Sequence, residues 1–301
     1  MKSSYVKLLA VSAAGALLAG CGGSSSDNGQ LKLAITDAPV DLADAVVVAF
    51  KGIEVKPADG PAFMLETFDP PLPINLMDLQ DGINQEIADA TVPAGQYNWI
   101  RLAVNLDEDG VVDPATESYI EIDLVQYPLW VPSGDQSGLK LVSGFIVPQG
   151  GVTDFTIDFD LRKSVHLPMN GDMRYVLKPA LRIVDNTIVG SIYGNVDPNL
   201  IVDDGSTCAV YAYEGEDVAA DDVGSPTEPL ASAGVKLDLV EPGQYGYRVA
   251  FLLPGTYTVA LTCEADQDDP ATDDDIAFSE GQTRTIPAEG GDERADFSAG
   301  T

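Results

Sequence analysis

The chain has 301 residues, 45% of them hydrophobic, and a formal charge of −32 at pH 7. This length is typical of two domains, and the apolar share excludes a wholly disordered chain. The acidic surplus excludes nucleic acid as a partner, because phosphate groups would be repelled, and it suits divalent cations. A solvated acidic surface is the alternative, since such a surface needs no ligand.

The N-terminus has the features of a secretory signal. Lys2 and Lys7 give a basic start, and residues 8–20 form an apolar run that is too short to span a bilayer. The run ends in Leu18-Ala19-Gly20-Cys21, which resembles a bacterial lipobox. In lipoproteins with this motif the peptidase cleaves before the cysteine, which then carries acyl chains such as palmitate. The resemblance implies a lipid anchor at Cys21, with an ordinary secretory signal as the alternative.

The segment after the cysteine indicates where the anchor places the protein. Gly22 follows Cys21 in place of an aspartate, which resembles outer-membrane lipoproteins of Gram-negative bacteria. Residues 22–30 are small and polar and are expected to form a flexible tether. We therefore expect an outer-membrane protein of the cell envelope that faces either the periplasm or the cell surface. Without residues 1–20 the chain keeps 14 basic and 48 acidic side chains, a formal charge of −34.

Alternating hydrophobic residues predict a series of short strands after the tether, with turn residues about every ten positions. Residues 74–89 are the one stretch expected to hold a helical turn. The strand pattern predicts an all-β fold with an antiparallel β-sandwich over residues 31–186. Its strands are expected at residues 31–36, 45–57, 63–68, 97–104, 118–124, 139–147, 154–161 and 175–184.

A second antiparallel β-sandwich, of immunoglobulin or transthyretin-like type, is expected over residues 187–301. Its strands are predicted at residues 190–196, 208–213, 234–240 and 245–263, with shorter segments at 284–288 and 294–298. Apart from Cys21, the only cysteines are Cys208 and Cys263. Export to an oxidising compartment predicts a disulfide between them. A zinc site is the rival interpretation, but a single histidine leaves it without further ligands.

The first of these domains resembles a bacterial lipoprotein domain of uncharacterised function. The matching segments are Thr36-Asp37-Ala38-Pro39, residues 45–57, PAGQYNWIRL (93–102), residues 131–145 and residues 157–165. Because that family has no established activity, the resemblance implies an envelope location and no chemistry.

Residues 187–301 resemble a carboxypeptidase-regulatory-like, transthyretin-like domain. The similarity rests on Gly190-x-Ile192-x-Gly194-x-Val196 and on Leu253-Pro254-Gly255-x-Tyr257. It implies an accessory or spacer module, not a peptidase. The second motif is similar to VPAGQY (92–97) in the first domain, and both are predicted to be a turn whose tyrosine packs near it.

The stretch NLDEDGVVD (105–113) has the oxygen spacing of a calcium loop. Asn105, Asp107, Asp109 and Asp113 alternate with other residues, and Gly110 occupies the sharp turn. An EF-hand is excluded, because the flanks are predicted strands and the twelfth position is Thr116. Two interpretations remain: a calcium loop on a β scaffold, or a polar hairpin turn built on Asp109-Gly110.

Other polar residues offer weaker candidates. Asp158 and Asp160 lie two apart on a predicted strand, so they share a face and are candidates for acid–base chemistry. Cross-strand ion pairs on a solvent face are the alternative. The run at residues 266–275 holds six aspartates and no glycine, which is typical of a solvated loop, with a weak cation site as the minor alternative. His166 is interpreted as a surface residue.

These features favour a non-catalytic envelope lipoprotein that acts as a binding, adhesive or structural module. Its expected contacts are the membrane, through the anchor, and an envelope protein or polysaccharide, and no cofactor beyond calcium is predicted. One alternative is a calcium-stabilised adhesin or glycan-binding module. Another is an envelope hydrolase that uses Asp158 and Asp160, which would require a concave pocket with converging groups.

Overall fold

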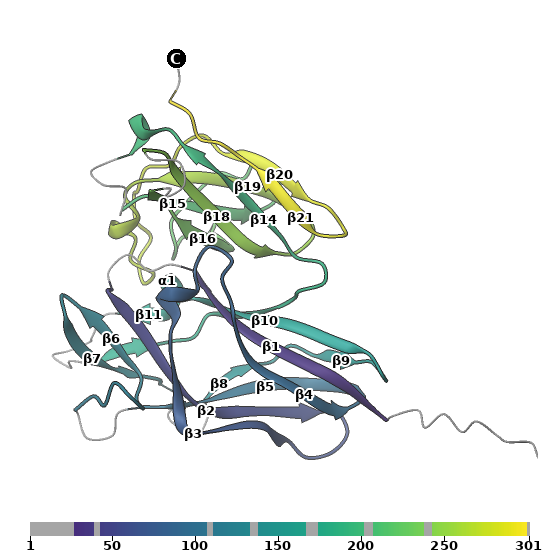
Figure 1. Cartoon of the computed structure of the whole chain (residues 1–301). Helices are drawn as coiled ribbons and strands as arrows, with labels where there is room; N and C mark the ends of the chain where they lie inside the picture. The colour runs from purple at the N-terminus through teal and green to yellow at the C-terminus, as the bar shows by residue number, and fades with distance from the viewer. Residues whose placement is uncertain are drawn as a thin grey trace, which may run out of the picture.

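The computed structural model describes residues 27–38, 43–106, 111–132, 138–166, 174–201, 207–237 and 243–299. The described chain is almost entirely β and forms four sheets, which confirms the all-β prediction. Two sheets come from residues 28–185 and are called the N-terminal sandwich here; two come from residues 190–294 and are called the C-terminal sandwich. The C-terminal sandwich lies above the N-terminal one in Figure 1. None of the described helices has the length and apolar character needed to cross a membrane.

The smaller sheet of the N-terminal sandwich faces the C-terminal sandwich (Figure 1). Its strands, in spatial order, are β13 (Leu181–Asp185), β10 (Val152–Asp160), β1 (Asn28–Ala38) and β4 (Gln85–Pro93). The pairing of β1 with β10 is parallel, which differs from the antiparallel sheet that we expected. A parallel pair needs a long connection, and most of the N-terminal sandwich lies between these two strands in sequence.

The larger sheet is built around two long strands, β2 (Ala45–Pro57) and β5 (Gly95–Asn105). Its other strands are β3 (Phe63–Asn75), β6 (Tyr119–Ile122), β7 (Val125–Trp130), β8 (Leu139–Leu141), β9 (Phe145–Val147), β11 (Val165–His166) and β12 (Tyr175–Leu177). A four-residue helix, α1 (Leu161–Ser164), joins β10 to β11 and so connects the two sheets.

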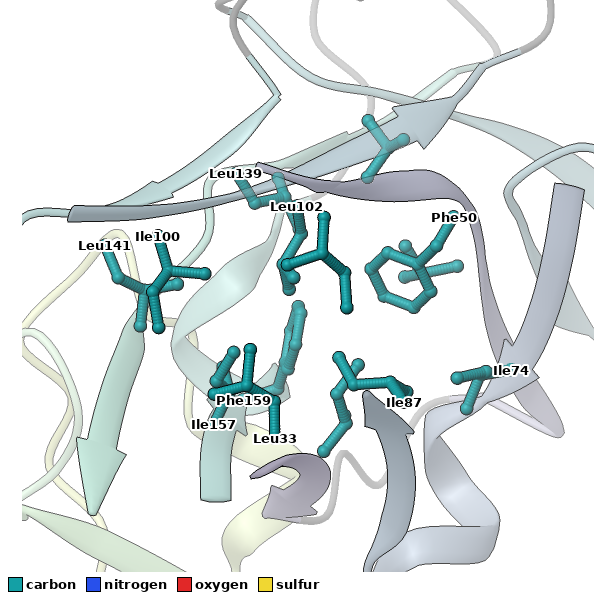
Figure 2. Close-up of a cluster of buried hydrophobic side chains, with 14 of the residues drawn as sticks. Leu33, Phe50, Ile74, Ile87, Ile100, Leu102, Leu139, Leu141, Ile157 and Phe159 are labelled. Atoms are coloured by element: carbon teal, nitrogen blue, oxygen red, sulfur yellow. The ribbon is translucent and has the colours of Figure 1, made fainter. Parts of the chain in front are cut away.

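The hydrophobic core lies between these two sheets (Figure 2). Alternate residues of a strand point to one face, so Leu31, Leu33 and Ile35 of β1 are all fully buried. Phe50 of β2 and Phe159 of β10 meet across the core with ring centroids 6.4 Å apart. The aromatic contact therefore links the two sheets at the end nearest α1.

Some predicted strands have different bounds in the structure. Residues 74–89 contain the expected helical turn, the 3₁₀ helix η1 (Leu76–Leu79), but the second half of this stretch is the beginning of β4. The stretch 139–147 is divided into β8 and β9, and 175–184 into β12 and β13. In the second case the division falls beside Pro179, which has no N–H to donate to a sheet.

The C-terminal sandwich has four strands in each sheet. One sheet has the order β17 (Lys236–Leu237), β18 (Tyr245–Leu252), β14 (Gly190–Val196) and β21 (Gly291–Arg294). The other has the order β16 (Ala231–Gly234), β15 (Ala209–Glu214), β19 (Gly255–Thr262) and β20 (Gln282–Ile286). Two 3₁₀ helices, η2 (Pro198–Leu200) and η3 (Ala265–Gln267), lie in the connections. The predicted strand 245–263 is divided at Leu253-Pro254 into β18 and β19, which belong to different sheets.

Two predicted local features of the sandwiches are confirmed. Cys208 and Cys263 form a disulfide that closes a loop of 55 residues. The similar Gly-x-Tyr turns also make the same hydrogen bond: the hydroxyl of Tyr97 donates to the carbonyl of Pro93, and that of Tyr257 to the carbonyl of Leu253, both at 2.8 Å. Each tyrosine thus ties a turn to the strand that follows it.

Candidate functional site

A buried arginine of α1 joins the two sandwiches. Only 4% of Arg162 is exposed, its Nη1 donates to the carbonyl oxygen of Ala265 at 2.8 Å, and its guanidinium lies 5.2 Å from the ring centroid of Tyr211. Asp160 caps α1 by accepting a hydrogen bond from the backbone N–H of Lys163 at 3.2 Å. The cap fixes the short helix, and the helix in turn directs Arg162 into the C-terminal sandwich.

Lysines add polar contacts on either side of this joint. Lys163 donates from Nζ to the carbonyl oxygen of Pro229 and lies 3.4 Å from a carboxylate oxygen of Glu228. Lys236 of the C-terminal sandwich donates to the side chain of Gln80 at 2.8 Å and pairs with Asp81 at 2.6 Å. The two sandwiches are therefore held at several separate points.

A cavity of about 360 Å³ lies beside Arg162, between the sandwiches. Its N-terminal wall is mostly apolar and includes Ile120, Ile122, Val165 and Tyr175. Its C-terminal wall is the segment 265–270, which carries three aspartates. The volume is within the range of small-ligand sites, and the walls differ sharply in polarity.

His166 lies at the end of β11, as predicted, but it is half-buried and lines this cavity instead of lying on an open surface. Burial and the nearby positive charge of Lys178 lower the pKa of its imidazole. The ring is therefore neutral at neutral pH. The sequence did not indicate the cavity because the segment that covers the end of β11 belongs to the other sandwich, about a hundred residues further along the chain.

Asp158 and Asp160 each make a structural contact within the fold. Asp158 lies directly opposite Arg182 in the pairing of β10 with β13, and Arg182 Nε is 2.5 Å from its Oδ2. The cross-strand ion pair is thus present, although on a buried face, since Asp158 is only 6% exposed. It lines a second cavity of about 20 Å³, which has room for roughly one water molecule. Asp160 is instead the cap of α1, and burial raises the pKa of its carboxyl.

The structure describes only part of the proposed calcium loop. Asp107 and Asp109 lie outside the described residues, as does Cys21. Asn105 donates from Nδ2 to the carbonyl oxygen of Thr116 at 2.7 Å. Asp113 accepts hydrogen bonds from the N–H of Ala115 and the hydroxyl of Thr116, both at 3.0 Å. The described ends of the loop are therefore engaged in its own turn, and calcium binding there stays a prediction.

The hairpin interpretation of this loop is wrong. Asn105 at the end of β5 pairs with Ala49, and Tyr119 at the start of β6 pairs with Val47, so both strands follow the same edge of β2. Strands β5 and β6 are not partners of each other. Ser118 closes the neck of the loop by donating to the carbonyl oxygen of Asn105 at 2.7 Å. The described strands β5 and β6 therefore follow one another along β2.

The aspartate-rich run at residues 266–275 is not simply a solvated loop. Asp268 is only 7% exposed, and burial raises the pKa of its carboxyl. Its Oδ2 accepts a hydrogen bond from the hydroxyl of Tyr211 at 2.5 Å. One ligand atom of Asp268 also lies within 4.8 Å of those of Asp222 and Asp274. The position of Asp222 beside this run was not predicted from the sequence. The two adjacent aspartates at 221–222 were the one feature of the sequence that could have indicated an acidic site there.

The fold and these sites define an all-β protein of two stacked sandwiches. Residues 28–179 match the model of the family described as Domain of unknown function (DUF4382), and the chain belongs to that family. No curated protein matches the chain.

Several solved structures are weakly similar. The Bacillus anthracis TIE protein shares 10% identity over 89% of this chain and 33% of its own, with a TM-score of 0.19, so this chain spans about a third of its length. BcpA, the major pilin subunit of Bacillus cereus, shares 11% identity over 90% of this chain and 99% of its own, with a TM-score of 0.20. The major pilin T-13 of Streptococcus pyogenes shares 10% identity over 91% of this chain and 100% of its own, with a TM-score of 0.17. Similarities at this level support no inference about fold or function.

Proposed function

We propose that this chain is a lipid-anchored, non-catalytic protein of the bacterial cell envelope that binds a partner in the cavity between its sandwiches. The cavity beside Arg162 carries the proposal, because it is concave, of ligand size and formed by both sandwiches. The lipobox at Cys21 and the flexible segment after it support the anchored location. Asp158 and Asp160, in contrast, each have a structural contact within the fold.

The chemistry of the cavity favours a lysine or arginine side chain of an envelope protein. Such a side chain has a long apolar stem, which suits the wall formed by Ile120, Ile122 and Val165, and a charged end, which suits Asp266 and Asp269 opposite. The formal charge of −32 on the whole chain would also speed the approach of a basic partner.

Substitution of one wall residue tests this binding. Ile122→Arg places a cation in the cavity, whereas Val125→Arg makes the same change at an exposed position on the partner strand of the same hairpin. Peptides with lysine or arginine between aliphatic residues serve as probes in fluorescence polarisation. We expect at least a tenfold loss of affinity for Ile122→Arg alone. Equal affinities in both variants, or binding of envelope polysaccharide in place of the peptides, would contradict the proposed partner.

The anchor is tested separately in cells. The unchanged chain is expected to incorporate radiolabelled palmitate and to sediment with membranes, and Cys21→Ser is expected to do neither. Palmitate incorporation that persists in Cys21→Ser would show that the cysteine is not the acylated residue. Protease treatment of whole cells then distinguishes the cell surface from the periplasm.

A further inference from the structure

Five aspartates from two distant segments converge beside the joint between the sandwiches. Asp221 and Asp222 lie between β15 and β16, whereas Asp268, Asp273 and Asp274 lie between β19 and β20. They form two triples, Asp221 with Asp222 and Asp273, and Asp222 with Asp268 and Asp274. Within each triple, one carboxylate oxygen from every residue lies within 4.8 Å of the other two. Asp222 belongs to both triples and is therefore the centre of the cluster.

The centre of the cluster is buried and lacks a hydrogen-bond partner. Asp222 is 0% exposed, and its Oδ1 accepts no hydrogen bond from any described residue. Its other oxygen, Oδ2, accepts one from the backbone N–H of Asp274 at 2.9 Å. A buried carboxylate oxygen without a partner is costly, and burial accordingly raises the pKa of this carboxyl. A bound cation would remove this cost.

The guanidinium of Arg162 does not neutralise this cluster of aspartates. Burial raises the pKa of Asp268, and the positive charge of Arg162 partly opposes this rise, so its charge reaches that side of the cluster. However, the same guanidinium already donates to Ala265 and lies over the ring of Tyr211. A single guanidinium can balance only one of the five carboxylates.

The two segments are packed closely enough to enclose an ion. Gly224 has a φ of 101°, and a Cβ at this position would lie 2.3 Å from the carbonyl oxygen of Thr272. Only glycine therefore permits this approach. The aspartate-rich run holds no glycine of its own, and the other segment supplies the one that shapes the site. The run is further ordered by hydrogen bonds from Asp269 N–H and the Thr272 hydroxyl to the Asp274 carboxylate, at 2.8 and 3.0 Å.

We propose that Asp222, Asp268 and Asp274 bind a calcium ion, with Asp221 and Asp273 completing the acidic ligand set. Hard oxygen ligands favour calcium or magnesium over transition metals, which prefer sites with histidine or cysteine. Calcium accepts six to eight oxygens in flexible geometry, whereas magnesium keeps several waters and needs near-ideal octahedral geometry. A crowded set of protein carboxylates from two loops therefore fits calcium better.

The site is connected to the cavity between the sandwiches. Asp268 accepts a hydrogen bond from the Tyr211 hydroxyl, and the guanidinium of Arg162 lies over the ring of Tyr211. The segment 265–270 also forms one wall of the cavity. Calcium at Asp268 would thus hold this wall in place and stiffen the joint. The effect on the cavity rests on the proposed function, but calcium binding itself does not.

The test uses the mature chain with Cys21→Ser, purified without lipid. Isothermal titration gives the affinity for calcium and for magnesium, and thermal unfolding is followed with calcium or with EDTA. At calcium about a hundred times the dissociation constant, we expect the Tm to rise by roughly 5–10 °C. Asp222→Asn is expected to weaken calcium binding about a hundredfold and to abolish the rise in Tm.

The comparison of variants separates a metal ligand from a structural residue. In EDTA, Asp222→Asn should be at least as stable as the parent chain, because the amide buries no charge. The matched control is Asp275→Asn, which removes one charge from the aspartate-rich run at an exposed residue outside both triples, and it should keep the full calcium effect. A structural role alone would lower the Tm of Asp222→Asn equally in calcium and in EDTA.

Three results would overturn the proposal. The first is no heat and no shift in Tm with calcium in the parent chain. The second is equal affinity for magnesium. The third is calcium binding that survives Asp222→Asn but is lost in the double variant Asp107→Ala with Asp109→Ala, which would place the ion in the loop at residues 105–113. Because peptide binding is measured separately, its failure would leave the calcium result unaffected.

Discussion

At the scale of single residues, the two tyrosine turns show how one sequence motif acts in both sandwiches. Tyr97 and Tyr257 are almost fully buried, yet each hydroxyl reaches the carbonyl of the residue four positions earlier. The ring contributes apolar burial, and the hydroxyl satisfies a turn carbonyl. The sequence predicts this feature because the turn, the strand and the partner all lie within six residues.

Removal of the two hydroxyls should therefore have equal effects in the two sandwiches. Tyr97→Phe and Tyr257→Phe are each expected to lower the free energy of unfolding by about 1 kcal/mol, because each keeps the ring and loses one hydrogen bond. Urea unfolding measures the loss. Tyr119→Phe is the control, since the Tyr119 hydroxyl has no hydrogen bond to a described residue, and it should change stability by less than about 0.5 kcal/mol. If Tyr119→Phe lowers the free energy of unfolding as much as the other two variants do, the loss of a hydrogen bond is not the cause.

The residues of the candidate sites are less predictable. Asp158 faces Arg182 because β10 and β13 are neighbours, which periodicity does not reveal. Asp222 and Asp268 meet for a similar reason, since the pairing of β15 with β19 brings their two loops to one end of the sandwich. Alternation along a strand predicts which residues share a face, but it does not predict which strand lies beside it.

At the scale of elements, long strands with clear alternation are predicted best. The predicted strands at residues 45–57 and 190–196 coincide with β2 and β14. Strand β4 was missed, because its apolar residues are few and half of them are small, as at Ala88 and Ala90. The stretch 245–263 was predicted as one strand, although Pro254-Gly255 divides it into two strands of different sheets, since these residues commonly form turns.

The disulfide acts at this scale, because it joins the start of β15 to the chain just after β19. These strands already pair at Ala209 and Thr262, so the bond closes the open end of an existing pair. Replacement of both cysteines by serine is expected to destabilise the C-terminal sandwich by about 4 kcal/mol, the chain-entropy value for a loop of this length. Urea unfolding with and without reductant measures this difference.

Reductant is itself the matched comparison for the cysteine variant. It should lower the unfolding midpoint of the parent chain and leave that of the double serine variant unchanged. An equal response of both proteins would show that reductant acts elsewhere. A loss below about 1 kcal/mol would show that strand pairing already restricts the unfolded chain, contrary to the entropy model.

At the scale of the whole molecule, two sandwiches with separate cores are joined by buried polar contacts. Each core is continuous within its own sandwich, and the contacts between them centre on Arg162 and Lys236. Domains linked mainly by polar contacts commonly move relative to one another unless the interface is large or specifically fixed. The buried guanidinium and the contacts of Lys163 and Lys236 oppose such motion here.

Loss of this guanidinium should uncouple the unfolding of the two sandwiches. Arg162→Leu removes the hydrogen bond to Ala265 and the cation–π contact with Tyr211. We expect the coupling free energy between the two sandwiches to fall by about 2 kcal/mol. Differential scanning calorimetry should then show two transitions where the parent chain shows a more cooperative one. Arg162→Lys keeps the charge but lacks the planar donor group, so its effect should be intermediate.

Arg294→Leu provides the control for this experiment. Arg294 is the last residue of β21, and its side chain is about half exposed and pairs with Asp296 away from the joint, so its loss should cost less than about 1 kcal/mol. If Arg162→Leu unfolds with the same profile as Arg294→Leu, the sandwiches are not coupled through α1. If calcium brings the two unfolding transitions of Arg162→Leu closer together in temperature, the ion stabilises the joint through the segment 265–270 independently of the guanidinium. This result would place the acidic cluster and Arg162 on two parallel routes that hold the cavity walls together.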